Sequence, residues 1–319
     1  MSKKAKKRTH PKGEQKNELL KINKLAENVG LAVDTFKGKV HIEWDPQAAV
    51  TPLGQLAFFI EFLKQGNLFE PWVNDCPLEF VSPNAPRKRD ILGTFLLSIL
   101  AGHWRYAHIT ALRADGVNPD LLGMTKVVSE DCSRRSFSKI DEDRGIAWKH
   151  KHLHRCYDPL LSMPWILDVD TIVKPLYGKQ EGAVLGYNPK KPGRPSHTYH
   201  AYTLANLRLV LDVEVQPGNQ MASCYSAPDL WKFLERILRE CWPKFIRRDC
   251  GFGTDGVMRA AEERSMHYLF KLKSSKQVKD LVARASMNDA WSYADYSFQA
   301  QEAAVKLQGW KQYRRGNFA

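Results

Sequence analysis

The order of predicted strands and helices in the second half of the chain constrains its fold more than any other feature. Residues 165–173 form a β-branched, apolar run between two prolines, which predicts a strand. Similar runs and turn residues predict two more strands, at 200–204 and 207–215. Beyond them helices and strands alternate, with a helix over 228–241, a strand over 244–248, a helix over 255–264 and a strand over 268–272.

Three consecutive strands followed by alternating helices and strands are the order of a ribonuclease-H-like core. We therefore predict an α/β fold class, in which residues 159–288 form an RNase H-like mixed sheet with flanking helices. In such a sheet the first and fourth strands along the chain are neighbours.

The remaining sequence predicts three further parts. Residues 1–16 are rich in lysine and almost free of apolar residues, which predicts a disordered basic arm that either contacts DNA or is simply solvated. Residues 17–158 carry apolar residues at helical spacing and predict a mainly helical region that binds DNA. Residues 289–319 alternate aromatic and polar residues, which predicts the start of a β-rich insertion of antiparallel strands.

The composition favours a polyanionic partner. The chain holds 48 Lys and Arg against 35 Asp and Glu, a formal net charge of +13, which points to nucleic acid ahead of an anionic membrane. The alternative is a basic surface that only keeps the protein in solution. The six cysteines form no Cys-x-x-Cys pair, and the longest apolar run, 95–101, is too short to span a bilayer. We therefore expect a cytoplasmic, nucleoid-associated protein with no membrane contact.

Acidic residues at the ends of two predicted strands are the candidates for chemistry. Asp168 and Asp170 lie two residues apart on the first strand and therefore share a face, and Asp249 ends the fourth strand before two glycines. Because these strands are predicted neighbours, their carboxylates would converge and could hold Mg²⁺ or Mn²⁺. The alternative is structural: Asp249 would cap the next helix, and Asp168 would lie at an exposed strand edge.

Basic residues outside the sheet are candidate DNA contacts. Lys190, Lys191 and Arg194 lie in a Gly- and Pro-rich loop after the first strand and could bind phosphates. Arg134 and Arg135 lie on a short helix that follows a capping serine. The alternatives are a plain connector for the loop and a solvated face for the helix.

A second pair of acids lies on the third predicted strand. Asp212 and Glu214 alternate with Leu211, Val213 and Val215, so the apolar residues should face the core. We expect both carboxylates to be exposed to solvent, and the alternative is that they lie near the metal site.

Several segments of the chain together resemble one family. The segments are 167–171, 177–180, the Gly-Tyr-Asn-Pro…Gly-Arg-Pro-Ser-His loop at 186–197, the Pro-Gly-Asn turn at 217–219, and 247–252. In this order they resemble the DDE transposases of bacterial insertion sequences, over roughly residues 30–319. The resemblance implies an RNase H-like catalytic core that cuts the element's ends with Mg²⁺-activated water and joins the 3′-hydroxyl to target DNA.

The resemblance also implies roles for the acidic residues. Asp249 matches the Asp-x-Gly-Phe context of the family's second acid, and Asp170 is the better match to the first acid, with Asp168 the alternative. Both acids would be catalytic metal ligands for Mg²⁺ or Mn²⁺. The partners would be double-stranded DNA, namely the terminal repeats and the target, bound by a homodimer that holds two ends together.

The family's third acid has no clear counterpart. It is a Glu on a late helix, whereas Glu262 and Glu263 come too early in the chain and Glu302 lies at the start of the predicted insertion. The third acid is therefore unknown, and we expect a product truncated by a stop or frameshift, or an incomplete gene. Two rivals follow: a non-catalytic DNA-binding fragment that inhibits a full-length enzyme, and an RNase H-like nuclease.

Overall fold

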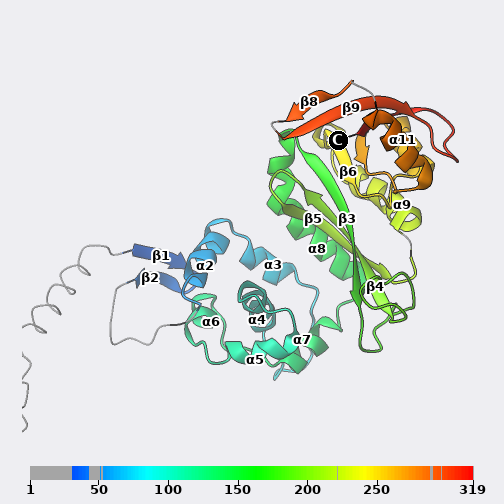
Figure 1. Ribbon diagram of the computed structural model, residues 1–319. Coiled ribbons are helices and arrows are strands. Elements are labelled where there is room, and N and C mark those ends of the chain that lie inside the picture. Colours follow the sequence, from blue (N-terminus) through cyan, green and yellow to red (C-terminus); the bar gives the residue numbers. More distant parts are fainter. Residues whose placement is uncertain are drawn as a thin grey trace, which may run out of the picture. The chain divides into compact units, whose positions relative to one another are not determined.

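A computed structural model describes residues 31–42, 51, 53–220, 222–287, 290–295 and 297–318 (Figure 1). It consists of two compact units, Met1–His152 and Leu153–Ala319, and helix α8 (Glu142–Tyr157) crosses the division between them. The predicted basic arm at 1–16 lies outside the described residues. The finer division at residues 158 and 288 stays a prediction.

The first unit is mainly helical, as predicted. Its helices carry their apolar residues into one core that includes Ile60, Phe69 and Ile91. The elements are the strands β1 (Leu31–Thr35) and β2 (Gly38–Ile42), the helices α2 (Leu56–Gln65), α3 (Phe69–Asp75), α4 (Lys88–Leu100), α5 (Ile109–Leu112), α6 (Val117–Leu121) and α7 (Glu130–Phe137), and the 3-10 turn η1 (Tyr106–His108).

The β1–β2 hairpin was not predicted. The two strands pair antiparallel around a tight turn in which the hydroxyl of Thr35 donates to the carbonyl of Gly38 over 2.7 Å. Gly38 has φ +134°, a conformation that favours glycine. Five-residue strands leave too short a pattern to distinguish them from the helical sequence that follows.

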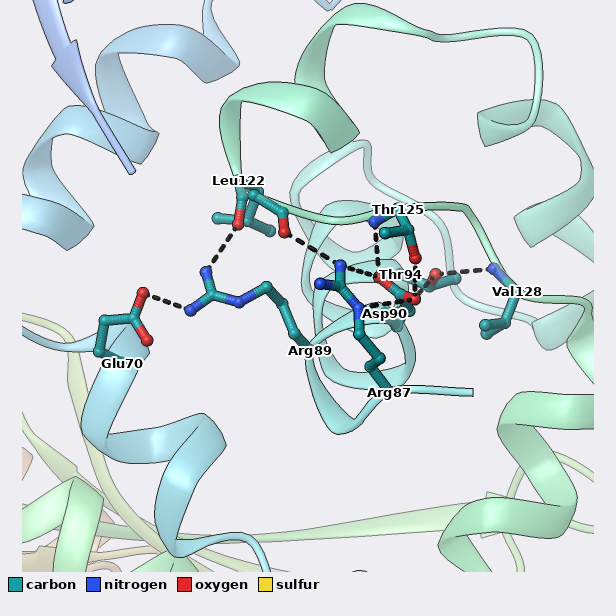
Figure 2. Close-up of polar contacts among 9 residues, drawn as sticks. Glu70, Arg87, Arg89, Asp90, Thr94, Leu122, Thr125 and Val128 are labelled. Carbon is teal, nitrogen blue, oxygen red and sulfur yellow. Dashed lines mark hydrogen bonds and ion pairs between the residues drawn. The ribbon is translucent and has the colours of Figure 1, made fainter. Parts of the chain in front are cut away.

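A buried carboxylate organises helix α4 (Figure 2). Asp90 is 1% exposed and accepts hydrogen bonds from the Thr125 backbone N–H (2.8 Å) and from Arg87 (3.1 Å). Burial disfavours its charge, but the hydrogen bonds from Arg87 and Thr125 outweigh burial and lower the pKa of Asp90. The Thr94 hydroxyl extends the network by accepting from the Val128 N–H at 3.1 Å. Asp90 and Thr94 together fasten the 125–128 segment to α4, so the Asp90 carboxylate has a structural role.

The second unit is built on a five-stranded mixed sheet in the order β5-β4-β3-β6-β7. Strands β3, β4 and β5 form an antiparallel meander, and β6 and β7 extend it in parallel from β3. This is the predicted RNase H-like topology. The strands are β3 (Ile166–Pro175), β4 (Ser196–Leu204), β5 (Leu209–Pro217), β6 (Phe245–Arg248) and β7 (His267–Phe270).

Helices cover one face of this sheet. Leu167, Val169 and Tyr202 are buried in a core with Leu230 and Phe233 of α9 (Ala222–Glu235). Helix α10 (Asp255–Glu263) adds Ala261 to the same core. We call this side the helix face. The opposite side, which carries Asp168, Asp170 and Arg247, is called the carboxylate face.

The connection from β3 to β4 is held against the sheet by close backbone contacts. Val184 pairs with Ser196 in an isolated bridge. A side chain at Gly186 would overlap the carbonyl of Gly218, and one at Gly218 would overlap Ser196. Three chain segments therefore meet at backbone distance, which explains why glycines stand in both the 186–197 loop and the 217–219 turn.

The C-terminal segment forms the predicted antiparallel strands. Strands β8 (Ser292–Asp295), β9 (Phe298–Val305) and β10 (Arg314–Phe318) make a sheet in the order β10-β9-β8, after helix α11 (Lys276–Ser286). Arg314, which is buried, ties this sheet to α10 through ion pairs of 2.7 Å with Asp255 and with Glu262. Among the described residues, no helix is long and apolar enough to cross a membrane.

Candidate metal and nucleic-acid site

Asp170 of β3 and Asp249, the residue that follows β6, both come directly after the last register pair of two neighbouring strands. Strands β3 and β6 are parallel, with Val169 opposite Arg248, so the next step along both strands places Asp170 beside Asp249. Paired strands lie about 4.8 Å apart. Both aspartates are exposed, and within the described residues neither carboxylate forms an ion pair. Each accepts one local backbone hydrogen bond: Asp170 from Thr171 N–H (2.8 Å) and Asp249 from Gly251 N–H (3.0 Å).

The turn that presents Asp249 is anchored on both sides by buried groups. The guanidinium of Arg248 lies 3.8 Å from the centre of the Phe252 ring, and both side chains are buried. The Phe252 N–H donates to the Asp249 carbonyl over 3.3 Å, and the Arg248 carbonyl accepts from Lys271 N–H at 3.1 Å. Asp249 therefore sits on a short turn with little freedom to move.

Asp168 has a different environment from Asp170, although both lie on the carboxylate face. Arg247 grips Asp168 with two parallel hydrogen bonds, from Nε to Oδ1 at 2.7 Å and from Nη2 to Oδ2 at 2.6 Å. Hydrogen bonding to Asp168 raises the pKa of Arg247. Both carboxylate oxygens of Asp168 are thus engaged, while Asp170 stays open.

The donor set of Asp170 and Asp249 fits a hard divalent cation in part. Two carboxylates on one exposed face are suited to Mg²⁺ or Mn²⁺, which keep several waters. In the part of the chain that the structure describes, no group of three or more His, Cys, Asp or Glu could hold a metal. Glu262 bonds Arg314 and Tyr268, Glu302 pairs with Arg315 at 2.8 Å, and Glu263 is exposed at the end of α10. The position of a third acid therefore stays unknown.

The expectation that Asp212 and Glu214 are exposed was wrong. Asp212 is 1% exposed and forms an ion pair of 2.7 Å with Arg236, and Glu214 accepts from the Tyr202 hydroxyl over 3.2 Å. A β-bulge causes the difference: Tyr202 pairs with Asp212 and Thr203 pairs with Val210, so Leu211 is the extra residue. The bulge reverses the alternation, which turns both acids to the helix face and leaves Val215 exposed at 52%.

Two further titratable residues lie on the helix face, and their burial was not predicted from the sequence. Arg248 is 3% exposed and His200 is fully buried. Among the described residues no hydrogen-bond partner meets the guanidinium or the imidazole nitrogens. Burial lowers the pKa of both groups. The alternation of Arg247 outward and Arg248 inward was a usable signal for one of them.

The predicted loop contacts lie on one exposed turn. Lys190, Lys191 and Arg194 line a hollow of about 480 Å³ together with Pro192, Gly193 and Pro195. Buried Asn188 closes this turn, because its amide donates to the Arg194 carbonyl (3.2 Å) and accepts from the Lys191 N–H (3.0 Å). The Arg194 guanidinium lies 4.4 Å from the centre of the Tyr177 ring. A rigid, cationic turn of this kind suits phosphate binding.

The predicted contacts on α7 have an internal counter-ion. Arg134 pairs with Asp131 at 2.6 Å, and Arg135 pairs with the same carboxylate. The hydrogen bond from Arg134 lowers the pKa of Asp131. Both guanidinium groups are more than half exposed, and exposed ion pairs contribute little free energy, so both remain accessible to a phosphate.

The comparison with protein families identifies the family of the chain. The sequence of residues 85–316 matches the transposase DDE domain group 1 family, so the chain belongs to that family of DNA transposases. No curated protein matches the sequence.

The chain is also similar to solved structures of transposases, at low sequence identity and low TM-score. A cryo-EM structure of the piggyBac transposase synaptic complex with hairpin DNA is 12% identical over 80% of this chain, with a TM-score of 0.35, and the chain spans only 58% of its length. The Mos1 transposase paired-end complex with the left transposon end is 12% identical over 79% of each chain, with a TM-score of 0.23. The Mos1 mariner paired-end complex with Mn is 13% identical over 90% of this chain and 88% of its own, with the same TM-score of 0.23.

Proposed function

We propose that the protein is a Mg²⁺- or Mn²⁺-dependent DNA transposase that cleaves the ends of its element and transfers them to target DNA. The observation that carries the proposal is the parallel register of β3 and β6 in an RNase H-like sheet, in which Asp170 and Asp249 both follow the last pair, Val169 and Arg248. Membership of the transposase DDE domain group 1 family supports the reaction class.

Asp170 and Asp249 are the residues that would hold the cation. When bound, such a cation activates water or a 3′-hydroxyl and stabilises the leaving oxygen in displacement at phosphorus. Asp170 is favoured over Asp168 because Arg247 already occupies both oxygens of Asp168. The turn between Arg248 and Phe252 holds Asp249 in place for this task.

The basic residues would bind the DNA backbone. Lys190, Lys191 and Arg194 would take phosphates at the β3–β4 loop, and Arg134 and Arg135 would exchange Asp131 for phosphates. The substrates would be double-stranded terminal repeats and target DNA in the nucleoid, and a homodimer would hold two ends together. Equilibrium sedimentation with and without end DNA tests the dimer.

The test of the function is strand cleavage of terminal-repeat DNA with Mg²⁺ or Mn²⁺. We expect cleavage by the wild type, loss of at least about 100-fold in Asp170→Asn and Asp249→Asn, and near wild-type rates in Asp168→Asn. Cleavage that survives Asp249→Asn, or that needs no divalent cation, would contradict the proposal.

One observation favours a second candidate, a non-catalytic DNA-binding protein that competes with an active transposase. Within the described residues no group of three or more His, Cys, Asp or Glu could hold a metal, so Asp170 and Asp249 have no third ligand of these types. This candidate predicts salt-dependent binding to terminal repeats with no cleavage in either cation. A third candidate, an RNase H-like nuclease, predicts cleavage without preference for any end sequence.

A further inference from the structure

The connection between β3 and β4, residues 176–195, combines a basic turn with exposed aromatic rings. We call this surface the outer side of the β3–β4 hairpin. Tyr177 is 73% exposed and Tyr187 is 78% exposed, although tyrosine usually buries most of its ring. Both flank the strand-entry segment: Leu176 N–H bonds the Pro195 carbonyl at 2.9 Å, and Asn188 bonds the Arg194 carbonyl. The two rings are therefore carried on a fixed frame.

One side of the Tyr177 ring is covered by a side chain of the protein itself. The Arg194 guanidinium stacks over it at 4.4 Å, yet most of the side chain remains accessible. A flat group could stack on the other side while the guanidinium neutralises a nearby phosphate. The connection at 176–195 holds four basic residues (Lys179, Lys190, Lys191 and Arg194) against one acidic residue, Glu181.

The carboxylate face extends from Asp170 along β3 toward the loop at 176–195. Alternation along β3 places Ile172 and Lys174 on the same face as Asp170, and both are exposed. On β4, Tyr199 lies opposite Ile172, and Lys174 Nζ is 5.9 Å from the centre of its ring. The path from Asp170 to the end of β3 at Pro175 is five residues, roughly 17 Å at about 3.3 Å per residue. That length matches about five nucleotides of one strand at about 3.4 Å each.

We propose that the outer side of the β3–β4 hairpin, from Tyr199 and Lys174 to Tyr177, Tyr187 and Arg194, binds a single-stranded stretch of DNA next to the carboxylate pair. The proposal rests on the proposed function for its DNA partner. Exposed rings favour unpaired bases, because a duplex hides its base faces and offers phosphates alone to the lysines. The tyrosines would stack bases, and the cations would follow the backbone.

The experiment compares three DNAs in EDTA buffer by fluorescence anisotropy: a blunt 20-base-pair duplex, the same duplex with a five-nucleotide overhang, and the overhang strand alone. 2-Aminopurine in the overhang reports stacking. We expect the wild type to bind the overhang duplex more tightly than the blunt one, with quenched 2-aminopurine. Tyr177→Ala with Tyr187→Ala should remove this preference, and each of the two substitutions should weaken single-strand binding about 5- to 150-fold.

Matched variants separate stacking from charge and from folding. Tyr177→Phe keeps the ring and should bind within twofold of wild type. Tyr313→Ala removes another exposed tyrosine, which is 70% exposed with Lys306 Nζ 5.6 Å from its ring centre, and should have no effect. Lys190→Gln should weaken binding to all three DNAs and reduce the salt slope by about one.

Three results would overturn the proposal. The first is that the wild type binds the blunt and overhang duplexes with equal affinity. The second is that the tyrosine variant loses the same affinity for all three DNAs. The third is that the tyrosine variant changes self-association in light scattering while its overhang binding is unchanged. The last result would make the loop a protein contact. Because the assay contains no divalent cation, these outcomes are independent of the Asp249 cleavage test.

Discussion

The two faces of the five-stranded sheet carry acids in the same sequence pattern and use them in opposite ways. Asp168 and Asp170 stand two apart on β3, and Asp212 and Glu214 stand two apart on β5. On the helix face, Asp212 is paired with Arg236 and Glu214 with the Tyr202 hydroxyl. On the carboxylate face, Asp170 is exposed and, within the described residues, makes no ion pair.

The comparison teaches that burial decides what an acid can do here. A carboxylate removed from water must be paired or protonated, so its oxygens are committed to the fold. A carboxylate on an open face keeps its oxygens for a ligand. Asp168 is intermediate, because it lies on the open face but is held by Arg247. The predictions below test this division, beginning with the largest expected change in stability.

Asp212→Ala should destabilise the second unit by about 3–5 kcal/mol, because it leaves the Arg236 charge partly buried without this partner. The matched change on the other face, Asp170→Ala, should cost at most about 0.5 kcal/mol. Urea unfolding of the full chain, followed by tryptophan fluorescence, measures both. An equal loss of free energy of unfolding in the two variants would show that the two faces do not differ in how they hold their acids.

Glu214 should make stability depend on pH. Burial, followed by the nearby Asp229 charge, raises the pKa of Glu214 from 4.5 to about 7. The folded state therefore holds a proton that the unfolded state releases, so this contribution is complete below about pH 4.5 and is lost as the pH rises to about 7. The change should be on the order of 3 kcal/mol.

The control for this dependence is Glu214→Gln, which cannot ionise. Its free energy of unfolding is measured in urea from pH 4.5 to 7.5. This free energy should fall less with rising pH than that of wild type, because the contribution of Glu214 is absent. A variant curve parallel to that of wild type would show that Glu214 titrates normally.

Breaking the Asp168–Arg247 pair should have the smallest effect on stability. The pair is partly exposed, so Asp168→Asn should cost at most about 1 kcal/mol in the same urea assay. Arg247→Gln is the reciprocal variant and should cost a similar amount. A loss of several kcal/mol would show that Asp168 is a structural acid of the kind found on the helix face.

The sequence was sufficient to predict the strand order of the sheet and the adjacency of its two strands with acids. Apolar runs mark β3 and β6, and once the order is known, neighbouring parallel strands bring Asp170 and Asp249 together. The faces of β5 could not be predicted, because the bulge at Leu211 depends on pairing with β4 rather than on local sequence. The apolar residues of β5 therefore indicated the wrong side.

The hydrogen-bonded pair of Arg247 and Asp168 could not be predicted either, since it joins residues far apart in the chain. Nor does local sequence show that Phe252 and Arg248 anchor the turn at Asp249, which depends on tertiary packing. The short β1–β2 hairpin was missed for a different reason, because its strands are too short to show a clear period.

The most direct test of the central claim is a Mn²⁺ titration followed by electron paramagnetic resonance on the full chain without DNA. Wild type should bind Mn²⁺, Asp170→Asn and Asp249→Asn should each weaken binding at least about tenfold, and Asp168→Asn should stay within about twofold. Binding that is unchanged in Asp170→Asn and Asp249→Asn, or lost only in Asp168→Asn, would contradict the assignment of the open carboxylate pair as the metal site.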